Sequence, residues 1–455
     1  MMAAGQAQHV VLIVGGAVAG SEAAAQFTAR GVLCIVLDQN VRPYGKIEDG
    51  LPRWHVKLRE SEEDKIDAKL ARADVLFVPR TRLGRDLTLD EVRAWGFSAV
   101  VLANGAWRDR PLPIPHADAY VGRGLAYQNP FVMWFNHYTD PGYDGPQYDV
   151  PDGALVVGGG LASLDVVKIL QLETVVRALR ARGIQADLYD VERRGVKKVL
   201  EEHGLGLEAL GLRGCTLIYR RRVEDMPLAD LPDAATPEQA ERTRGTRRKL
   251  LANFREKYMF NFQGLLSPLA AVAEGGRLAG LRFQRTELRN GFLALSPGEG
   301  VELRAPLVVS SIGSTPESVD GVQMRGELYP VKDLETGELE GLPGVFAIGN
   351  AVTGKGNILV SLKHGRRVSQ RMLESYLLGE ASGYEEAFAG AATSAGTTAA
   401  AVAERLGAAP PLPPDRVRVI VEKVQALQAR AGYPGDYWTW IAKARPGRPP
   451  KRSRP

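Results

Sequence analysis

The sequence predicts an α/β protein built from two interleaved Rossmann-like domains. Two apolar runs carry this prediction, each ending in a glycine turn and leading into a helical stretch: Val10 to Gly20 (VVLIVGGAVAG) and Gly153 to Leu170 (GALVVGGGLASLDVVKIL). Strand, turn and helix in this order begin a β-α-β unit, and such a unit commonly binds a dinucleotide. Because the second turn starts about a third of the way along the chain, we expect a three-layer first domain with a second dinucleotide-binding domain inserted into it.

Composition narrows the class of protein. The 455 residues are 45% hydrophobic and 24% charged, which is enough for two or three domains. With no run of about twenty apolar residues and no export signal, we expect a cytoplasmic protein without a membrane segment. The two cysteines, Cys34 and Cys215, lie far apart in apolar runs, and no CxxC pair or metal-ligand spacing of histidines is present. We therefore expect no metal site and no disulfide relay.

The first turn has the pattern of a site for an adenine dinucleotide. The glycines permit a tight turn, and the following helix would present free N–H groups to a pyrophosphate. A carboxylate at the end of the next strand can accept hydrogen bonds from ribose hydroxyls. A domain with a glycine turn and no ligand remains the alternative, since Ala17 replaces the middle glycine of the motif. The candidate binding residues are Gly15, Gly16, Ala19, Gly20 and Asp38.

The second turn repeats the pattern with the opposite charge. Ser163 replaces its last glycine, and the next strand ends in the arginine triplet 220–222, where the first unit has an acid. Guanidinium groups can bind a ribose 2′-phosphate through paired bonds, whereas an acid would repel it. This difference predicts FAD at the first turn and NADPH at the second, with a solvated strand end as the alternative for the arginines. The candidate residues are Gly158, Gly160, Leu161, Ala162, Arg220 and Arg221.

These motifs resemble the adrenodoxin reductase-type ferredoxin–NADP reductases, which are glutathione reductase-like flavoproteins with two dinucleotide sites. The resemblance covers roughly residues 8 to 375 and includes GGGLASLDVVKIL, VVSSIG and QNPFVMWFNH, while YRRRVEDMP is closer to the glutamate synthase small subunit. It implies an FAD-binding domain at about 1–128 and 316–380 and an NADP-binding domain at 129–315. Residues 381–455 would form a C-terminal helical extension with a basic tail.

The same resemblance implies further site residues. VVLANGA is similar to the segment that leaves the first domain, and GVFAIGNAVTGKGNI is similar to the late flavin-binding segment. His55 and Asp165 correspond to the family's proton-handling pair, although His55 can equally be a surface histidine. The additional cofactor residues implied are Gly45, Ala103, Gly105, Gly349, Asn350, Gly356, Asn357 and Ile358.

The implied function is that of an oxidoreductase passing electrons from NADPH through FAD to ferredoxin or a similar acidic one-electron carrier. Basic residues of the second domain are candidates for steering that carrier: Arg193, Arg194, Lys197 and Lys198. The first alternative is the NADPH-oxidising subunit of a glutamate synthase-like complex, although such subunits normally carry a cysteine-rich domain that we do not find here. The second is a non-catalytic flavin-binding protein. We expect a monomer or homodimer and no nucleic-acid binding.

Three segments outside the two turns are predicted to be helical. They are the charged insertion 172–212, a helix at 361–378, and VRVIVEKVQALQARAG near the C-terminus. In the last of these, we expect the apolar residues Val419, Val421, Val424 and Leu427 to pack on the first domain. The final KRSRP is expected to be disordered.

Overall fold

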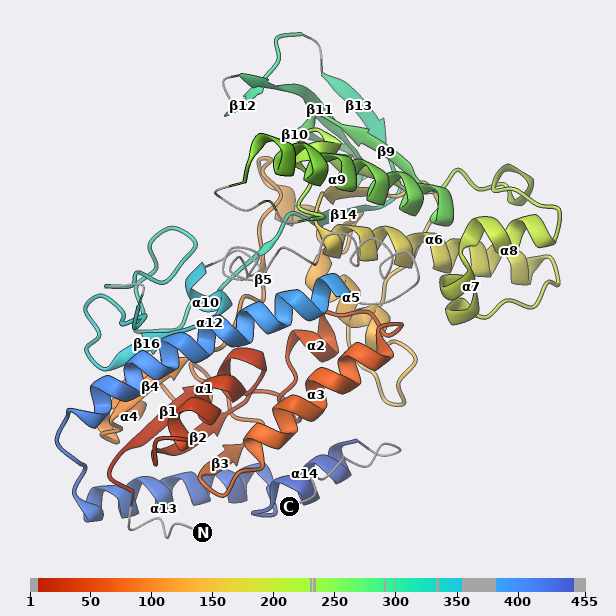
Figure 1. The fold of residues 1–455 in the computed structure, drawn as a ribbon. Coiled ribbons are helices and arrows are strands. Elements are labelled where there is room, and N and C mark those ends of the chain that lie inside the picture. The colour runs from red at the N-terminus through yellow and green to blue at the C-terminus, as the bar shows by residue number, and fades with distance from the viewer. Residues whose placement is uncertain are drawn as a thin grey trace.

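The computed structural model has two α/β halves, one above the other in Figure 1. It describes residues 7–229, 231, 235–289, 292–298, 300–332, 335–353 and 382–445. The predicted helix 361–378, the candidate residues Gly356, Asn357 and Ile358, and the C-terminal KRSRP lie outside the described residues. Within the part of the chain that is described, no helix has the length and apolar character needed to span a membrane.

The first half is built on a five-stranded parallel sheet in the order β16-β4-β1-β2-β3. Successive side chains of a strand point to opposite faces, so Val11 and Ile13 enter the core on one side while Leu12 and Val14 enter the core on the other. Because both faces are covered, the strands read as continuous apolar runs. The strands are β1 (Val10–Val14), β2 (Leu33–Leu37), β3 (Val75–Val78), β4 (Ala99–Leu102) and β16 (Val345–Ala347).

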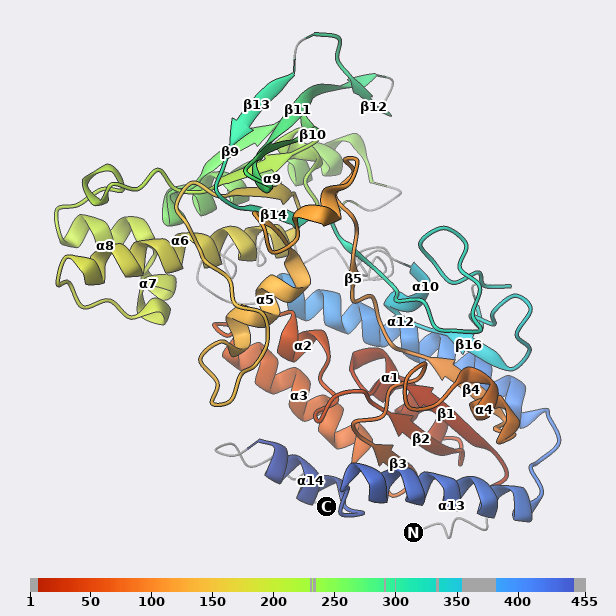
Figure 2. The same ribbon diagram turned by 180° about the vertical axis from the view of Figure 1, so that it is seen from behind.

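Helices cover this sheet on both faces. The long helix α12 packs against α1, and Figure 1 shows it crossing in front of the sheet, whereas Figure 2 shows α13 on the opposite side. The helices are α1 (Val18–Thr28), α2 (Lys46–Asp49), α3 (Val56–Leu70), α4 (Leu89–Ala94), α10 (Asn350–Thr353), α12 (Ser382–Gly407), α13 (Pro414–Ala431) and α14 (Tyr437–Ala444).

Helix α13 packs on the first sheet, but with a different face from the predicted one. Val421, Val424 and Leu427 are buried as expected, whereas Val419 is 42% exposed. The buried face is instead completed by Val417 and Ile420. Val419 was therefore wrongly assigned, because it lies about 200° around the helix from Val417 and so points away from the sheet.

The second half has its own five-stranded parallel sheet in the order β6-β14-β7-β8-β9. The charged insertion is helical as predicted: α6 continues to Ala181, and α7 and α8 project from the side of this half (Figure 1). The strands are β6 (Leu125–Tyr127), β7 (Leu155–Gly158), β8 (Thr216–Tyr219), β9 (Asn261–Gly264) and β14 (Val308–Ser311). The helices are α5 (Gln128–His137), α6 (Leu161–Ala181), α7 (Leu188–Arg194), α8 (Val196–Glu202) and α9 (Pro237–Tyr258).

Two smaller sheets complete the architecture. An antiparallel sheet caps the second half and consists of β10 (Leu266–Glu274), β11 (Arg277–Arg289), β12 (Phe292–Leu295) and β13 (Val301–Arg304). A two-stranded ribbon, β5 (Arg108–Asp109) with β15 (Ser314–Thr315), carries the chain out of the first half and back again. The two halves are therefore interleaved, with β16 returning to the first sheet after the whole of the second half.

Candidate functional site

The first glycine turn is packed so tightly that side chains are excluded. Gly15 has φ of +99°, and a Cβ there would lie 2.6 Å from the Ala103 carbonyl oxygen. A Cβ on Gly20 would lie 1.8 Å from the Gly15 carbonyl oxygen. Helix α1 starts immediately after the turn, with no side chain capping its N-terminus and no acidic residue in its first turn. Its free N–H groups are therefore available to an anionic ligand.

Asp38 lies at the end of β2 beside this turn and is 6% exposed. Its Oδ2 accepts the Gly16 N–H at 2.9 Å, and its Oδ1 accepts the Asn40 N–H at 2.9 Å. Burial raises the pKa of Asp38 to about 6, against the lowering effect of these two backbone bonds. Since each carboxylate oxygen has two lone pairs, both can still accept a hydroxyl from a ligand.

A pocket extends from this turn along the carboxyl ends of the first sheet. Its walls include eight of the predicted cofactor residues: Gly15, Ala19, Asp38, Gly45, Ala103, Gly105, Gly349 and Asn350. Two acceptors in the pocket, Oδ1 of Asn104 and Oδ1 of Asn350, are buried without a hydrogen-bond partner in the described structure. Buried orphan acceptors are rare, so a ligand with hydroxyl donors fits this pocket. Asn104 was missed, although it lies inside the quoted VVLANGA.

Sequence reasoning also missed a cation in the pocket. Lys46 lines it, with Nζ 3.2 Å from the Ser314 hydroxyl oxygen and 5.5 Å from the centroid of the Trp107 ring. Burial lowers the pKa of Lys46 to about 8, and burial raises the pKa of the nearby Asp109 to about 6. A partly desolvated ammonium group in this position suits a ligand that carries negative charge.

The second glycine turn joins β7 to α6. A Cβ on Gly158 would lie 2.2 Å from the Ser311 carbonyl oxygen, so the turn packs directly on β14. The Ser163 hydroxyl donates to that carbonyl oxygen at 3.0 Å. Helix α6 begins at Leu161 after Gly160, again with no side-chain cap and no acidic residue in its first turn. Leu161 and Ala162 therefore present the start of a helix to solvent, where an anion can bind.

The three arginines after β8 differ in whether they form ion pairs. Arg222 is paired with Asp225, with Nε 3.0 Å from Oδ2. Arg220 is exposed and Arg221 is half-buried, and among the residues the structure describes neither side chain forms an ion pair, although the charge of Arg221 acts on Asp225. Their backbone is fixed, because the Arg220 carbonyl oxygen accepts the Thr286 hydroxyl at 2.7 Å. Two guanidinium groups thus remain available next to the second turn.

The structure brings His55 and Asp165 together. His55 is the residue before α3 in the first half, Asp165 lies on α6 in the second half, and their side chains are 6% and 2% exposed. His55 Nε2 lies 3.7 Å from Asp165 Oδ1, and these two atoms, with His55 Nδ1, have no hydrogen-bond partner in the described chain. His55 is therefore not a surface histidine.

Two contacts at this pair could not be read from the sequence. The hydroxyl of Tyr384, on α12, donates to Asp165 Oδ2. One turn along α6 from Asp165, Lys168 is paired with Glu192 and its Nζ lies 4.3 Å from the centroid of the Trp54 ring. Both contacts depend on how distant elements pack, so no local sequence signal predicts them.

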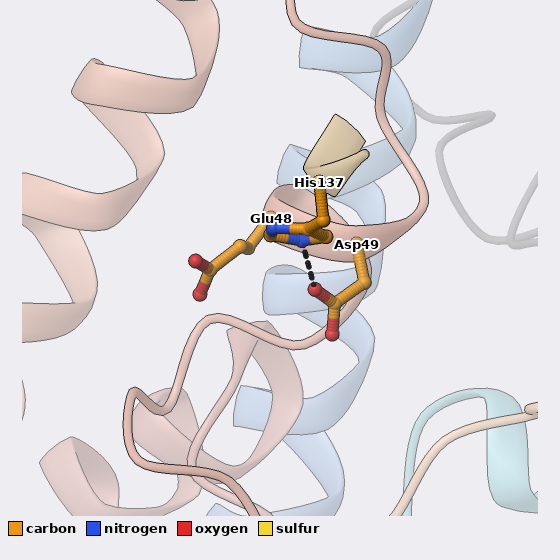
Figure 3. Close-up of side chains that lie close together, drawn as sticks. All are labelled: Glu48, Asp49 and His137. Carbon is orange, nitrogen blue, oxygen red and sulfur yellow. Dashed lines mark hydrogen bonds and ion pairs between the residues drawn. The ribbon is translucent and has the colours of Figure 1, made fainter. Parts of the chain in front are cut away.

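Glu48, Asp49 and His137 form a cluster that resembles a metal site (Figure 3). His137 Nε2 lies 3.0 Å from Asp49 Oδ1, and its Nδ1 lies 2.7 Å from Asp140 Oδ2. Glu48 is paired with Arg42. The hydrogen bond to Asp49 raises the pKa of His137, against the lowering effect of burial. Both ring nitrogens of His137 thus lie within hydrogen-bond distance of carboxylates, so the imidazole bridges α2 and α5.

Three of the four proposed steering residues on α7 and α8 are ion-paired, whereas Lys198 is exposed and forms no ion pair with the described residues. Arg193 pairs with Asp190 at 2.7 Å, Arg194 pairs with Asp190 at 2.8 Å, and Lys197 pairs with Glu256 at 2.6 Å. Surface pairs of this kind weaken the field that a distant partner would feel. The acid opposite Lys197 comes from α9, which the sequence did not place beside α8.

Comparisons with known proteins agree with this architecture. No family model matches the chain. It is 26% identical over 314 residues to the mitochondrial NADPH:adrenodoxin oxidoreductase of Arabidopsis thaliana, covering 63% of this chain and 63% of that protein. The chain thus matches less than two thirds of that relative's length. It is also 25% identical over 396 residues to the glutamate synthase [NADPH] small chain of Mycobacterium tuberculosis, covering 82% of this chain and 68% of the relative.

The fold has a solved counterpart. The His57Gln mutant of FprA from Mycobacterium tuberculosis superposes with a TM-score of 0.66 at 20% identity, covering 93% of this chain and 91% of FprA. FprA has also been solved in complex with NADPH. The resemblance predicted from the motifs and the predicted fold class are both confirmed.

Proposed function

We propose that the protein is an FAD-containing oxidoreductase that takes electrons from NADPH and passes them to a ferredoxin-like one-electron carrier. The opposite polarity of the two turns carries this proposal: a buried acid follows the first, and two arginines that form no ion pair among the described residues follow the second. The similarity to an NADPH:adrenodoxin oxidoreductase supports it. The predicted domain boundaries, cytoplasmic location and monomeric or homodimeric state remain predictions.

The first pocket fits FAD. Asp38 would accept hydrogen bonds from the adenosine ribose, and the N-terminus of α1 would hold the diphosphate. The unpartnered Oδ1 atoms of Asn104 and Asn350 would accept bonds from ribityl hydroxyls. When bound, FAD supplies the chemistry that joins a two-electron donor to a one-electron acceptor.

The second turn fits NADPH. Arg220 and Arg221 would bind the 2′-phosphate through charge-assisted hydrogen bonds, and the start of α6 would hold the diphosphate. Asp165 lies on the same helix, so binding there brings the nucleotide and the His55–Asp165 pair to one place. His55 can exchange a proton at Nε2, facing Asp165 Oδ1, while the surrounding residues exclude water from both side chains.

The test is a reconstitution under anaerobic conditions. The purified protein should carry FAD, lose its 450 nm absorbance when NADPH is added, and regain it when oxidised ferredoxin is added. Repeating the last step over a series of NaCl concentrations asks whether charge steers the carrier, and a steep fall in rate is expected if it does. A protein that binds no FAD would overturn the proposal.

A second candidate is the NADPH-oxidising subunit of a glutamate synthase-like complex. The similarity to a glutamate synthase small chain favours it, because that similarity extends over 82% of the chain. The same reconstitution separates the two. Reoxidation by ferredoxin alone favours the first candidate, whereas a reduced flavin that ferredoxin cannot reoxidise favours the second.

A further inference from the structure

Helix α12 delivers a tyrosine to the His55–Asp165 pair. The Tyr384 hydroxyl donates to Asp165 Oδ2, and the Tyr384 ring meets the His55 ring edge-on, with centroids 5.4 Å apart and an interplanar angle of 65°. Three parts of the chain thus meet at this point: the start of α3, helix α6 and the start of α12.

The same helix also forms a wall of the first pocket. Phe388 and Ala391 line the pocket, and the Phe388 ring stacks on the Tyr384 ring with centroids 6.4 Å apart. Phe388 lies one helical turn after Tyr384. A row of neighbouring rings therefore runs from the wall of the cofactor pocket through Tyr384 to His55.

The hydrogen bond from Tyr384 gives the two carboxylate oxygens of Asp165 different neighbours. Oδ2 is occupied by the hydroxyl, which leaves Oδ1 facing His55 Nε2 at 3.7 Å. A hydroxyl that donates to a carboxylate forms a strong, oriented bond, and in a buried site it restricts rotation of the carboxylate. Without it, the Asp165 side chain would be free to turn away from the imidazole.

We propose that Tyr384 is a positioning residue, whose hydroxyl holds Asp165 with Oδ1 directed at His55 and so couples helix α12 to the proton-handling pair. This inference rests on the proposed function. Lys168, one turn further along α6, is already paired with Glu192 and lies between the rings of Trp54 and Tyr258. Among the described residues, Tyr384 is the one whose side chain hydrogen-bonds Asp165.

The test compares Tyr384→Phe with Tyr138→Phe. The control removes a hydroxyl of the same kind, since Tyr138 donates to Glu173 Oε1 at 2.9 Å away from the pair. The measurements are the NADPH dissociation constant, the rate of flavin reduction by stopped flow from pH 5.5 to 9, and the melting temperature. We expect Tyr384→Phe to slow flavin reduction about tenfold and move its pH profile, as the loss of one hydrogen bond to an ionised group should. NADPH affinity should change less than twofold, and Tyr138→Phe should leave rate and profile unchanged.

A double-mutant cycle provides the second arm. In an Asp165→Asn background, Tyr384→Phe should change the rate less than twofold, because the carboxylate that it positions is gone. Equal effects of Tyr384→Phe in the two backgrounds, or a rate and pH profile matching those of Tyr138→Phe, would overturn the proposal while leaving the proposed function intact.

A third arm does not need FAD or NADPH. In protein labelled with ¹⁵N-histidine, the ring nitrogen signals of His55, assigned with His55→Gln, report which nitrogen faces Asp165. Tyr384→Phe should shift them, whereas Tyr138→Phe should not. Unshifted His55 signals in Tyr384→Phe would refute the positioning role even if the protein proved unable to bind FAD.

Discussion

The two glycine turns are built alike where they would meet a diphosphate and oppositely where they would meet a ribose. Helices α1 and α6 both begin without a side-chain cap. Helices α4 and α9, which begin elsewhere in the structure, both have capping boxes, Thr88 with Glu91 and Thr236 with Gln239. Other described helices, α2, α3, α5, α8 and α13, also begin without a side-chain cap, so the missing cap alone does not mark a site. What α1 and α6 share is an uncapped start directly after a tightly packed glycine turn, where an anion can reach the free N–H groups.

The difference between the turns lies at the end of the next strand. After β2 comes Asp38, which is buried and tied to the turn by the Gly16 N–H. After β8 come the exposed Arg220 and the half-buried Arg221, which form no ion pair in the described chain. In the proposed function, the sign of the charge at this one position of the β-α-β unit would decide which nucleotide is accepted.

The largest expected effect is steric and should separate the crowded Gly20 of the first turn from the open Gly160 of the second. Gly20→Ala places a methyl group 1.8 Å from the Gly15 carbonyl oxygen, whereas at Gly160 the nearest atom to a Cβ is Pro227 Cγ at 4.0 Å. Gly20→Ala should lower FAD affinity more than about 100-fold. Gly160→Ala should retain FAD, and the flavin content of the two purified variants measures this. If both variants lost FAD equally, steric room at these two glycines would not control FAD binding.

The next effect should appear at the second turn. Replacing Arg220 and Arg221 together with alanine removes the groups proposed to bind the 2′-phosphate, so kcat/KM for NADPH should fall about 100-fold. The value for NADH should change less than threefold. Arg222→Ala is the matched control, because Arg222 is already paired with Asp225. A large loss of kcat/KM for NADPH in Arg222→Ala would place the 2′-phosphate at Arg222 instead.

Asp38 should act on the first cofactor only. Asp38→Asn keeps the shape but removes an acceptor, so FAD affinity should fall about tenfold. Because the pKa of Asp38 is about 6, the carboxylate becomes protonated as the pH falls through 6, and FAD should bind more weakly below that pH in the wild type. The variant should lose this pH dependence. Fluorescence titration of the apoprotein with FAD from pH 5 to 8 checks both expectations.

The smallest effect concerns the junction between the halves. The hydrogen bond to Asp49 raises the pKa of His137, so the stabilisation that it contributes is complete below pH 6.5 and is lost as the pH rises through the raised value. The melting temperature should therefore fall by about 2 °C more in the wild type than in His137→Gln between pH 6 and pH 8.5. If the melting temperatures of the two proteins changed in parallel over this range, the hydrogen bond between His137 and Asp49 would not contribute pH-dependent stability.

The sequence predicted what local spacing determines and missed what packing determines. Both turns, Asp38 and Arg220 could be identified because strand, glycine and charge follow one another within one β-α-β unit. His55 and Asp165 came from a resemblance, since nothing local joins α3 to α6. Tyr384, Phe388 and the acid facing Lys197 were missed because each depends on a helix that arrives from elsewhere in the chain.

The central claim is that the acid at the first turn and the arginines at the second assign FAD and NADPH to separate sites. The most direct test is the anaerobic reduction of the wild-type protein by NADPH and by NADH at equal concentrations, followed at 450 nm. The account predicts a yellow protein that NADPH bleaches about 100-fold faster than NADH does. A colourless protein, or bleaching by NADH at the same rate or faster, would contradict it.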